Sequence, residues 1–258
     1  MNSNVTMNLF NFSLAYLLLI FILFLMKKAK IKQTKLLFLA SFRMTLQLMI
    51  AGFILTYIFK NPNPLFLFVY LGGMIIFTVY RVLSKNEGLN ATFKKIIAFS
   101  ITISGIVVLL FFMIVVANKS ILNPQYVIPI AGMLMGNTMN GVSLGIKTFR
   151  ESLKTQQLLI TTLLNMGVKP TKILMPFVNQ AFETAMLPRL NNMVGMGIVT
   201  LPGMMTGQIL SGTLPSTAVL YQIAIMLAIT AVVSSAVFFS LYLGHKTLYN
   251  ERNQINIK

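Results

Sequence analysis

The sequence predicts an all-α polytopic membrane protein with about seven transmembrane helices, an N-terminus outside the cell and a cytoplasmic C-terminus. The 258 residues are 56% hydrophobic and only 10% charged, with a mean hydropathy of +0.80, whereas soluble domains carry roughly 25% charged residues. The apolar residues form stretches of about 20 residues, which is the length that crosses a bilayer. The basic residues collect between these stretches.

Seven apolar stretches follow one another, and five lysines come directly after the first. A signal peptide has its charges before the apolar run, so this stretch is expected to stay in the membrane. The stretches lie at approximately residues 8–26, 36–59, 65–83, 96–117, 125–146, 186–211 and 218–243. Residues 172–190 are ambiguous, since they could add part of a span or lie along the membrane surface.

The positive charges favour this orientation, because cytoplasmic loops carry an excess of Lys and Arg. Of the 21 Lys and Arg residues, 17 lie in segments predicted to be cytoplasmic, and Lys60 and Lys119 lie in segments predicted to be outside. The net charge of +17 would suggest nucleic-acid binding in a soluble protein. Here the membrane orientation accounts for the charge, and no nucleic-acid partner is expected.

Short polar segments separate the predicted helices. Residues 60–64 (KNPNP) form a tight turn after the second stretch, and Asn123-Pro124 precedes the fifth. The cytoplasmic region 147–172 is predicted to hold a helix over 147–166, which Gly167 and Pro170 terminate. A second helix is expected to begin at about residue 171.

Residues 1–258 are interpreted as a single transmembrane domain without an internal repeat. Because inverted repeats give many carriers their two-fold symmetry, symmetry is expected here from a second copy, in a homodimer. The sequence has no cysteine, no aspartate, one histidine and four glutamates, which argues against an enzyme that uses carboxylates or metals. Residues 141–148 lack the spacing of a phosphate-binding loop. The chain is therefore expected to bind no cofactor, and any ATP and Mg²⁺ belong to a partner.

Residues 188–212 are apolar, yet they contain five glycines and Pro202, at which a helix is expected to kink or break. Interrupted helices at membrane depth occur where the backbone is buried in protein or lines a cavity. In carriers such helices mark the binding site. This stretch is therefore the predicted working part of the molecule.

The fifth stretch carries amides at membrane depth. Asn137 and Asn140 lie three residues apart and share a helix face. An unpaired amide in hydrocarbon is costly, so this face is expected to point at protein or water. Two interpretations stay open, namely hydrogen bonding between helices and a substrate path. The methionines likewise serve either as flexible packing or as ligands for a soft metal such as Cu(I).

Three motifs resemble one family. They are residues 127–137 (VIPIAGMLMGN), 164–170 (LNMGVKP) and 197–212 (GIVTLPGMMTGQILSG). They are similar to the Fet-type iron-export ABC permease family, which is related to the plant aluminium-sensitivity permease. The resemblance covers nearly the whole chain, including Arg43 with Gln47 and the Tyr221-Gln222-Ile223 run. It implies a multi-pass plasma-membrane subunit that dimerises and is driven by two copies of a separate ABC ATPase. It also implies a role in metal tolerance, with iron as the expected exported ion.

The resemblance implies roles for two sets of residues. The coupling element, which the ATPase would push, consists of Leu163, Leu164, Asn165, Met166, Gly167, Val168, Lys169, Pro170 and Thr171. The substrate path or gate consists of Asn137, Met139, Asn140, Pro202, Gly203, Met204, Met205, Thr206 and Gln208. The resemblance implies no metal-ligand set among these residues.

Two regions depart from the family pattern. Family members usually place carboxylates where residues 159–162 stand here, and they often carry a basic residue near Glu183. These differences lie on the face expected to meet the ATPase, so a partner with altered charge is expected. Glu183 could pair with Arg189 or with a partner's lysine, or remain a solvated surface charge.

Other functions are weighed against metal export. The same machine could carry an organic substrate such as a nucleotide sugar, as one plant relative suggests. A stand-alone secondary carrier would need titratable groups within its spans, and the third, fourth, fifth and seventh stretches lack one well inside. A non-transporting membrane scaffold would leave the glycine- and proline-broken stretch unexplained.

Overall fold

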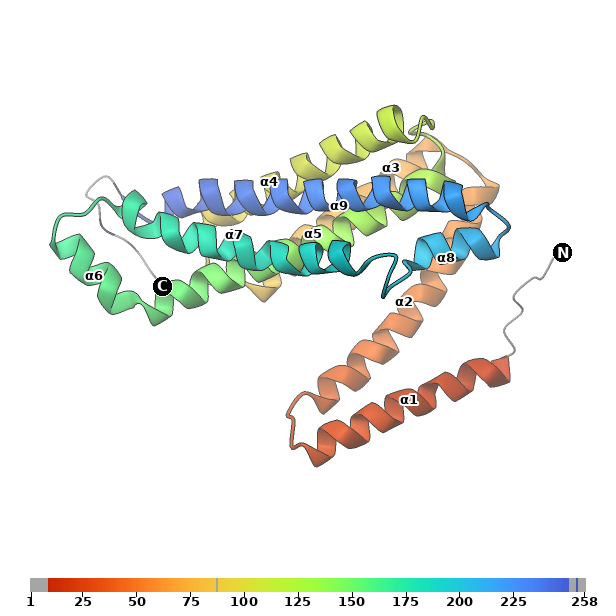
Figure 1. Ribbon diagram of the computed structural model, residues 1–258, viewed down its shortest axis with the longest axis horizontal. Coiled ribbons are helices and arrows are strands. Elements are labelled where there is room, and N and C mark those ends of the chain that lie inside the picture. Colours follow the sequence, from red (N-terminus) through yellow and green to blue (C-terminus); the bar gives the residue numbers. More distant parts are fainter. Residues whose placement is uncertain (1–8, 87, 251–253, 255–258) are drawn as a thin grey trace. The chain divides into compact units, whose positions relative to one another are not determined.

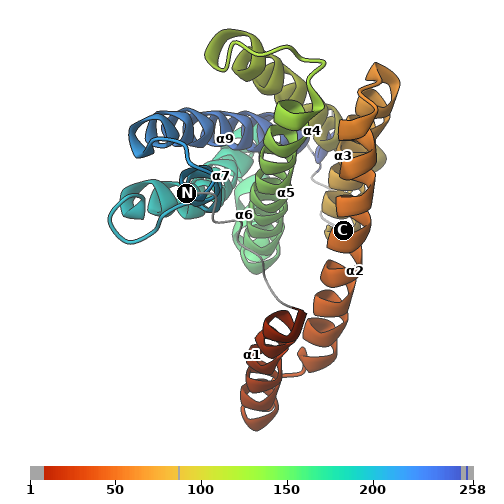
Figure 2. The same ribbon diagram turned by 90° about the vertical axis from the view of Figure 1, so that its right-hand side faces the viewer.

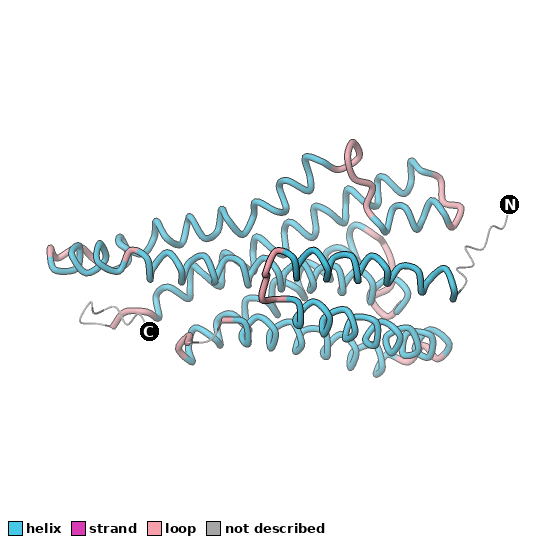
Figure 3. The backbone as a smooth tube through the Cα atoms, turned by 90° about the horizontal axis from the view of Figure 1, so that it is seen from below, coloured by secondary structure: helices cyan, strands magenta, loops and turns pink. Residues whose placement is uncertain are grey.

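The computed structural model describes residues 9–86, 88–250 and 254, which form helices joined by short turns (Figures 1 and 3). Within these residues no strand occurs, and Met196 and Thr200 form an isolated bridge. The all-α prediction is therefore confirmed for the described part of the chain. The chain divides into two compact units, Met1–Asn61 and Pro62–Lys258.

The first unit is a helical hairpin of α1 (Leu9–Lys28) and α2 (Thr34–Lys60). A hydrogen bond of 2.7 Å between the hydroxyls of Tyr16 and Thr45 joins the two helices. Most large apolar side chains of α2 are exposed, and Phe53 has 80% of its surface accessible. Such a surface suits lipid or another protein rather than water.

The second unit contains the remaining elements. They are α3 (Pro64–Lys85), α4 (Ala91–Phe111), a π-helical turn (Phe112–Val116), α5 (Pro124–Thr155), α6 (Gln157–Asn165), α7 (Pro170–Gly195), α8 (Gly203–Leu210), α9 (Pro215–Gly244) and a 3-10 turn (His245–Thr247). Asn63, Asn90 and Asn123 cap the starts of α3, α4 and α5, because their side-chain oxygens accept hydrogen bonds from first-turn N–H groups. The predicted turns before α3 and α5 are thereby confirmed.

Helix α5 is the centre of the second unit and contacts α3, α4, α7 and α9. Figure 2 shows α7 and α9 on one side of α5 and α3 on the other. A Cβ at Gly141 would lie 2.5 Å from Val233 Cγ1 of α9, and one at Gly145 would lie 3.1 Å from Val237 Cγ1. The two glycines therefore permit the close approach of α5 and α9, as their spacing predicts.

Four helical segments are long and apolar enough to cross a membrane, and they correspond to the second, third, fourth and seventh predicted spans. They are Thr34–Lys60, Pro64–Lys85, Ala91–Val116 and Pro215–Thr247. These segments lie among the described residues, to which the side chains of Leu9 and Asn11 in α1 do not belong. The count of seven spans and their orientation remain predictions.

The predicted sixth span, residues 186–211, is interrupted, as expected for a stretch that contains Pro202 and several glycines. Helix α7 ends at Gly195, and α8 begins only at Gly203 and has eight residues. Between them Gly197 adopts a φ of +85°, and its N–H donates to the Thr200 carbonyl oxygen at 2.9 Å. The interruption therefore spans the residues between Gly195 and Gly203, with Pro202 directly before α8.

The ambiguous residues 172–190 belong to α7, which begins at Pro170 and contains Pro176 and Pro188. The predicted start of a helix at about residue 171 is therefore confirmed. Apolar side chains in the first half of α7, such as Ile173 and Phe177, are buried and fix this part of the helix in the core.

The separate cytoplasmic helix predicted over 147–166 is also wrong. Helix α5 continues without a break to Thr155, and α6 begins at Gln157. Phe149 and Leu153, one turn apart, are buried and anchor this continuation in the core. No glycine or proline stands between Gly145 and Gln157 to end the helix.

The basic ends of the helices gather at one end of the second unit (Figure 1). There Asn90 Nδ2 donates to the Thr247 carbonyl oxygen at 2.8 Å, and the Thr171 and Tyr249 hydroxyls lie 3.0 Å apart. At the opposite end the rings of Phe112 and Tyr221 meet edge to face, with centroids 6.1 Å apart. The helix ends that the sequence places in the cytoplasm therefore lie together.

Candidate functional site

The polar stretch of α5 is tied to α7 by one pair of side chains. Asn137 Nδ2 donates to the Met133 carbonyl oxygen at 2.7 Å, and Asn137 Oδ1 accepts a hydrogen bond from Arg189 Nη1. Both side chains are half-buried. Asn137 thus takes part in hydrogen bonding between helices, the first of the two interpretations of this stretch. Sequence reasoning missed Arg189 here, although a lone arginine in an apolar setting was a signal.

Among the described residues no ion pair joins Arg189 to Glu183, which rules out the first of the three alternatives left open for Glu183. Six residues along a helix correspond to about 600°, which points the two side chains in different directions. Glu183 is exposed, and the ion pair found among the described residues is Lys147 Nζ to Glu151 Oε1, at 3.7 Å. Glu183 is therefore left as a surface carboxylate, available to solvent or to a partner.

The outward face of α5 carries Gly136 and Asn140, which are exposed, with Met139 half-buried beside them. A Cβ at Gly136 would meet no atom within 4 Å, whereas one at Gly132 would lie 3.2 Å from Met74 Cε of α3. Gly132 therefore serves contacts inside the chain, and Gly136 belongs to an open surface. Asn137 and Asn140 do not share one contact, since the first is tied to α7 and the second is exposed.

The second half of the predicted path lies on the α7–α8 connection and on α8. Pro202 occupies the position before the first residue of α8, and the Thr206 hydroxyl donates to the Pro202 carbonyl oxygen at 3.1 Å. The predicted break at Pro202 is confirmed. The half-buried members of this set are Pro202, Met204, Met205, Thr206 and Gln208, and Gly203 is exposed.

Helix α8 packs mainly on α9. Its polar residues are therefore not brought against Asn137 and Asn140 of α5 within one chain. The connection itself is apolar and open, with Ile198 at 89% and Leu201 at 62% exposure. The two halves of the predicted path are separate surfaces in a single subunit.

Two methionine sulphurs hold α7 to α9. The Ser234 hydroxyl donates to Met186 Sδ at 3.4 Å, and the Thr230 hydroxyl donates to Met193 Sδ at 3.5 Å. Among the described residues no group of three or more His, Cys, Asp or Glu side chains is placed to hold a metal ion. These two methionines therefore serve helix packing.

The predicted coupling element forms a compact turn between α6 and α7. Gly167 has a φ of +79°, a conformation that favours glycine. Its N–H donates to the Leu164 carbonyl oxygen at 2.9 Å, and the Val168 N–H donates to that of Leu163 at 3.0 Å. Pro170 is then the first residue of α7. The helix stop predicted at Gly167 is thus confirmed.

This element is anchored at its base and open at its tip. Ile160 and Pro170 are buried, and Thr171 is bonded to Tyr249. By contrast, Leu158 has 82% and Met166 has 74% of its surface exposed. Leu158 and Ile160 belong to α6, before the predicted coupling element. Within the element itself, Asn165, Gly167 and Lys169 are exposed like Met166, and Leu163, Leu164, Val168 and Thr171 are half-buried. An exposed apolar tip on a rigidly packed base is a surface to which another protein could bind.

These features define an all-helical, multi-pass membrane protein. The family model described as "Uncharacterised protein family (UPF0014)" matches residues 9–249, and the chain belongs to this family. The match therefore confirms the resemblance, since the chain's relatives include a probable iron export permease and a plant protein named for aluminium sensitivity.

Three relatives show the extent of the similarity. The UPF0014 membrane protein YjkA of Bacillus subtilis is 30% identical over 94% of this chain and 98% of its own length. The Probable iron export permease protein FetB of Escherichia coli is 26% identical over 94% and 93%. The Protein ALUMINUM SENSITIVE 3 of Arabidopsis thaliana is 29% identical over 83% and 77%. No solved structure matches the chain.

Proposed function

We propose that this chain is the membrane-spanning permease of an ABC transporter and that it exports a metal ion, with iron as the first candidate. It works as a homodimer with two copies of a separate ATPase, and that partner binds ATP and Mg²⁺. The chain itself is a transporter subunit and not an enzyme. The similarity to the iron export permease FetB over 94% of the chain supports this assignment.

The observation that carries the proposal is the turn between α6 and α7. An exposed Met166 stands on a turn fixed by Gly167, and Pro170 joins that turn directly to a helix of 26 residues. A force applied at Met166 would therefore be passed along α7 to Arg189 and its hydrogen bond to Asn137. Packed helices transmit such a displacement because protein interiors are dense.

The open face of α5 supports the homodimer. Gly136 has no neighbour within 4 Å of a Cβ position, and Asn140 is exposed beside it. A small residue next to an amide suits a close helix–helix contact with a hydrogen bond across it. A second copy would supply that contact, and the substrate path would then lie between the two subunits.

The charges along the path favour a second candidate substrate. Arg189 places a positive guanidinium against Asn137, and the described residues hold no cluster of His, Cys, Asp or Glu ligands. A bare divalent cation is repelled by a guanidinium, whereas an anion is attracted. An anionic organic substrate such as a nucleotide sugar, or a metal carried as an anionic complex, is therefore the alternative cargo.

Transport by the reconstituted machine tests the proposal. The chain is purified with a candidate ABC ATPase of the same organism and placed in liposomes, and ATP is supplied on the side of the ATPase. Accumulation of Fe²⁺, Mn²⁺, Cu⁺, Al³⁺ and a radiolabelled nucleotide sugar is measured inside the vesicles. A Walker-A lysine variant of the ATPase is the control for ATP dependence.

ATP-dependent accumulation of one metal, with iron expected first, would support metal export. Accumulation of the nucleotide sugar alone would support an ABC permease with an organic substrate and would contradict metal export. A complex that hydrolyses ATP and moves none of the metals would contradict metal export. A chain that forms no complex with the ATPase would favour the scaffold function instead.

A further inference from the structure

A cavity opens at the basic end of the second unit, apart from the predicted path and from the coupling turn. Its volume is about 380 Å³, within the range of about 300–1,000 Å³ that is usual for ligand sites. It lies between the loop before α4, the end of α5 and the segment after α9. Its lining residues include Gly88, Phe93, Arg150, Lys154 and Leu248. The residues used for the proposed transport function take no part in it.

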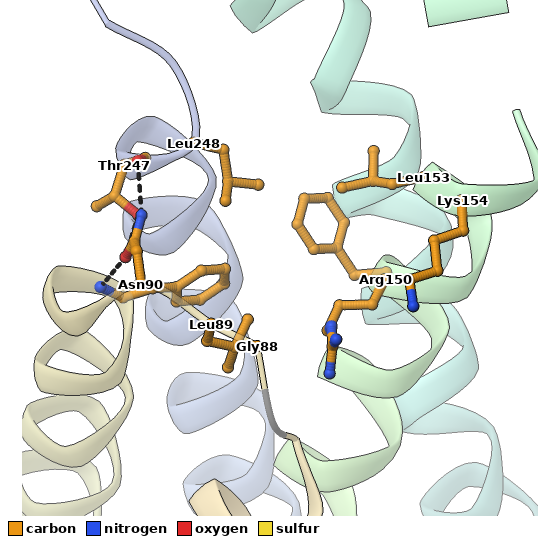
Figure 4. A pocket seen from close by; sticks show the side chains of 10 residues that line it. Gly88, Leu89, Asn90, Arg150, Leu153, Lys154, Thr247 and Leu248 are labelled. Carbon is orange, nitrogen blue, oxygen red and sulfur yellow. Dashed lines mark hydrogen bonds between the residues drawn. The ribbon is translucent and has the colours of Figure 1, made fainter. Parts of the chain in front are cut away.

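One wall of the cavity is cationic. Arg150 and Lys154 lie one turn apart on α5 and stand on the same wall (Figure 4). Neither makes an ion pair with a carboxylate in the described part of the chain, which leaves out Glu87. The backbone also comes close to the guanidinium, since a Cβ at Gly88 would lie 3.0 Å from Arg150 Nη2. The fold therefore places two positive charges at a cavity wall without neutralising them by a described acid.

The remaining walls are largely apolar. Phe93, Phe149 and Leu153 are buried where they line the cavity. Figure 4 shows Leu248 facing Leu153 across the space. The nearby polar side chain of Asn90 already has hydrogen-bond partners, because it caps α4 and donates to the Thr247 carbonyl oxygen. The cavity thus combines a positively charged wall, which suits an anion, with apolar walls, which suit hydrocarbon. A small soluble ion would contact only the charged wall.

We propose that this cavity binds the phosphate of an anionic membrane lipid, with the headgroup on Arg150 and Lys154 and the start of an acyl chain against the half-buried Leu248. The location fits this ligand, because the cavity lies where helix ends carry the basic residues expected at the cytoplasmic surface. Basic pockets between membrane helices on that side bind anionic lipid headgroups. The inference requires membrane location and does not depend on the transported substrate.

Lipid binding to the purified chain tests the inference. Native mass spectrometry follows the occupancy of phosphatidylglycerol and of phosphatidylcholine, which has a phosphate but no net charge. The Arg150→Gln/Lys154→Gln variant should lower phosphatidylglycerol affinity by about tenfold or more, since each basic residue near an anionic lipid contributes measurably. Phosphatidylcholine binding should not change. The matched control is Lys95→Gln/Lys172→Gln, which removes the same charge from exposed positions at the same end.

Three results would overturn the inference. The first is an equal loss of phosphatidylglycerol affinity in the control variant, which would indicate a diffuse charge effect. The second is displacement of the lipid by millimolar inorganic phosphate, which would make free phosphate the ligand. The third is unchanged lipid affinity with loss of the ATPase, which would make the cavity a protein docking site. The exchanged variant Arg150→Lys/Lys154→Arg keeps both charges and should still bind phosphatidylglycerol. This result would show that the lost affinity of the Gln variant comes from the missing charges and not from misfolding.

Discussion

Arg189 brings a positive charge to the polar stretch of α5, and its hydrogen bond to Asn137 links α7 to a residue of the predicted path. In Arg189→Leu the side-chain oxygen Oδ1 of Asn137 would lose its donor. A half-buried polar group left without a partner costs about 1–3 kcal/mol of stability. Thermal unfolding in detergent should show a lower midpoint for this variant, and Arg189→Gln, which keeps a donor, should lie closer to the wild type. Equal midpoints for all three proteins would show that the contact is not stabilising.

The same residue separates the two candidate cargoes. If a free metal cation passes Arg189, the neutral Arg189→Gln variant should transport it faster, because the repulsion is removed. If the cargo is an anion, the same variant should transport it more slowly. The measurement is initial transport rate per molecule of ATP hydrolysed, so that a change in ATPase activity is not mistaken for a change in permeation.

Gly167 holds the coupling turn in a left-handed conformation, with φ at +79° and open space around a Cβ position. Substitution by alanine therefore adds backbone strain without a clash, and the cost should be about 1–2 kcal/mol. Gly167→Asn should cost less, since asparagine tolerates this conformation. Differential scanning calorimetry of the three proteins checks the order. A Gly167→Ala protein as stable as the wild type would contradict this account of the turn.

Among the elements, α5 combines a closed face and an open face. At Gly141 a side chain would collide with Val233 of α9, so Gly141→Val should destabilise the subunit by about 1–3 kcal/mol through overpacking. At Gly136, on the open face, Gly136→Val should leave the unfolding midpoint of the subunit nearly unchanged. The same variant should instead weaken the homodimer, which multi-angle light scattering measures. A dimer that tolerates Gly136→Val would exclude this face as the interface.

Local signals in the sequence predicted most helix ends. The Asn-Pro pairs before α3 and α5, the glycine after α6 and Pro202 before α8 all act through neighbouring backbone atoms, so the sequence reveals them. The continuation of α5 to Thr155 depends on the burial of Phe149 and Leu153 against distant helices, which a window along the chain does not contain. The bond from Arg189 to Asn137 is likewise a long-range contact. The path and coupling roles of the candidate residues remain predictions.

For the whole molecule, the orientation is open to a direct test, because the chain contains no cysteine. Single cysteines at Ser120, in the exposed turn before α5, and at Lys172, exposed in the first turn of α7, provide reporters without a background signal. In intact cells a membrane-impermeant maleimide should label Ser120→Cys and not Lys172→Cys. After the cells are opened, both should react. Labelling of Lys172→Cys in intact cells would contradict the orientation drawn from the basic residues.

The central claim is that the turn between α6 and α7 receives an ABC ATPase. The most direct measurement is the affinity of the purified chain for a candidate ABC ATPase of the same organism, determined for wild type, Met166→Ser and Val199→Ser. Both substitutions remove an exposed apolar side chain, at 74% and 81% exposure, but only Met166 lies on the turn. We expect a stable wild-type complex that Met166→Ser weakens about tenfold or more, as for an interface anchor, and that Val199→Ser leaves intact. The absence of a wild-type complex, or equal effects of the two substitutions, would contradict the claim.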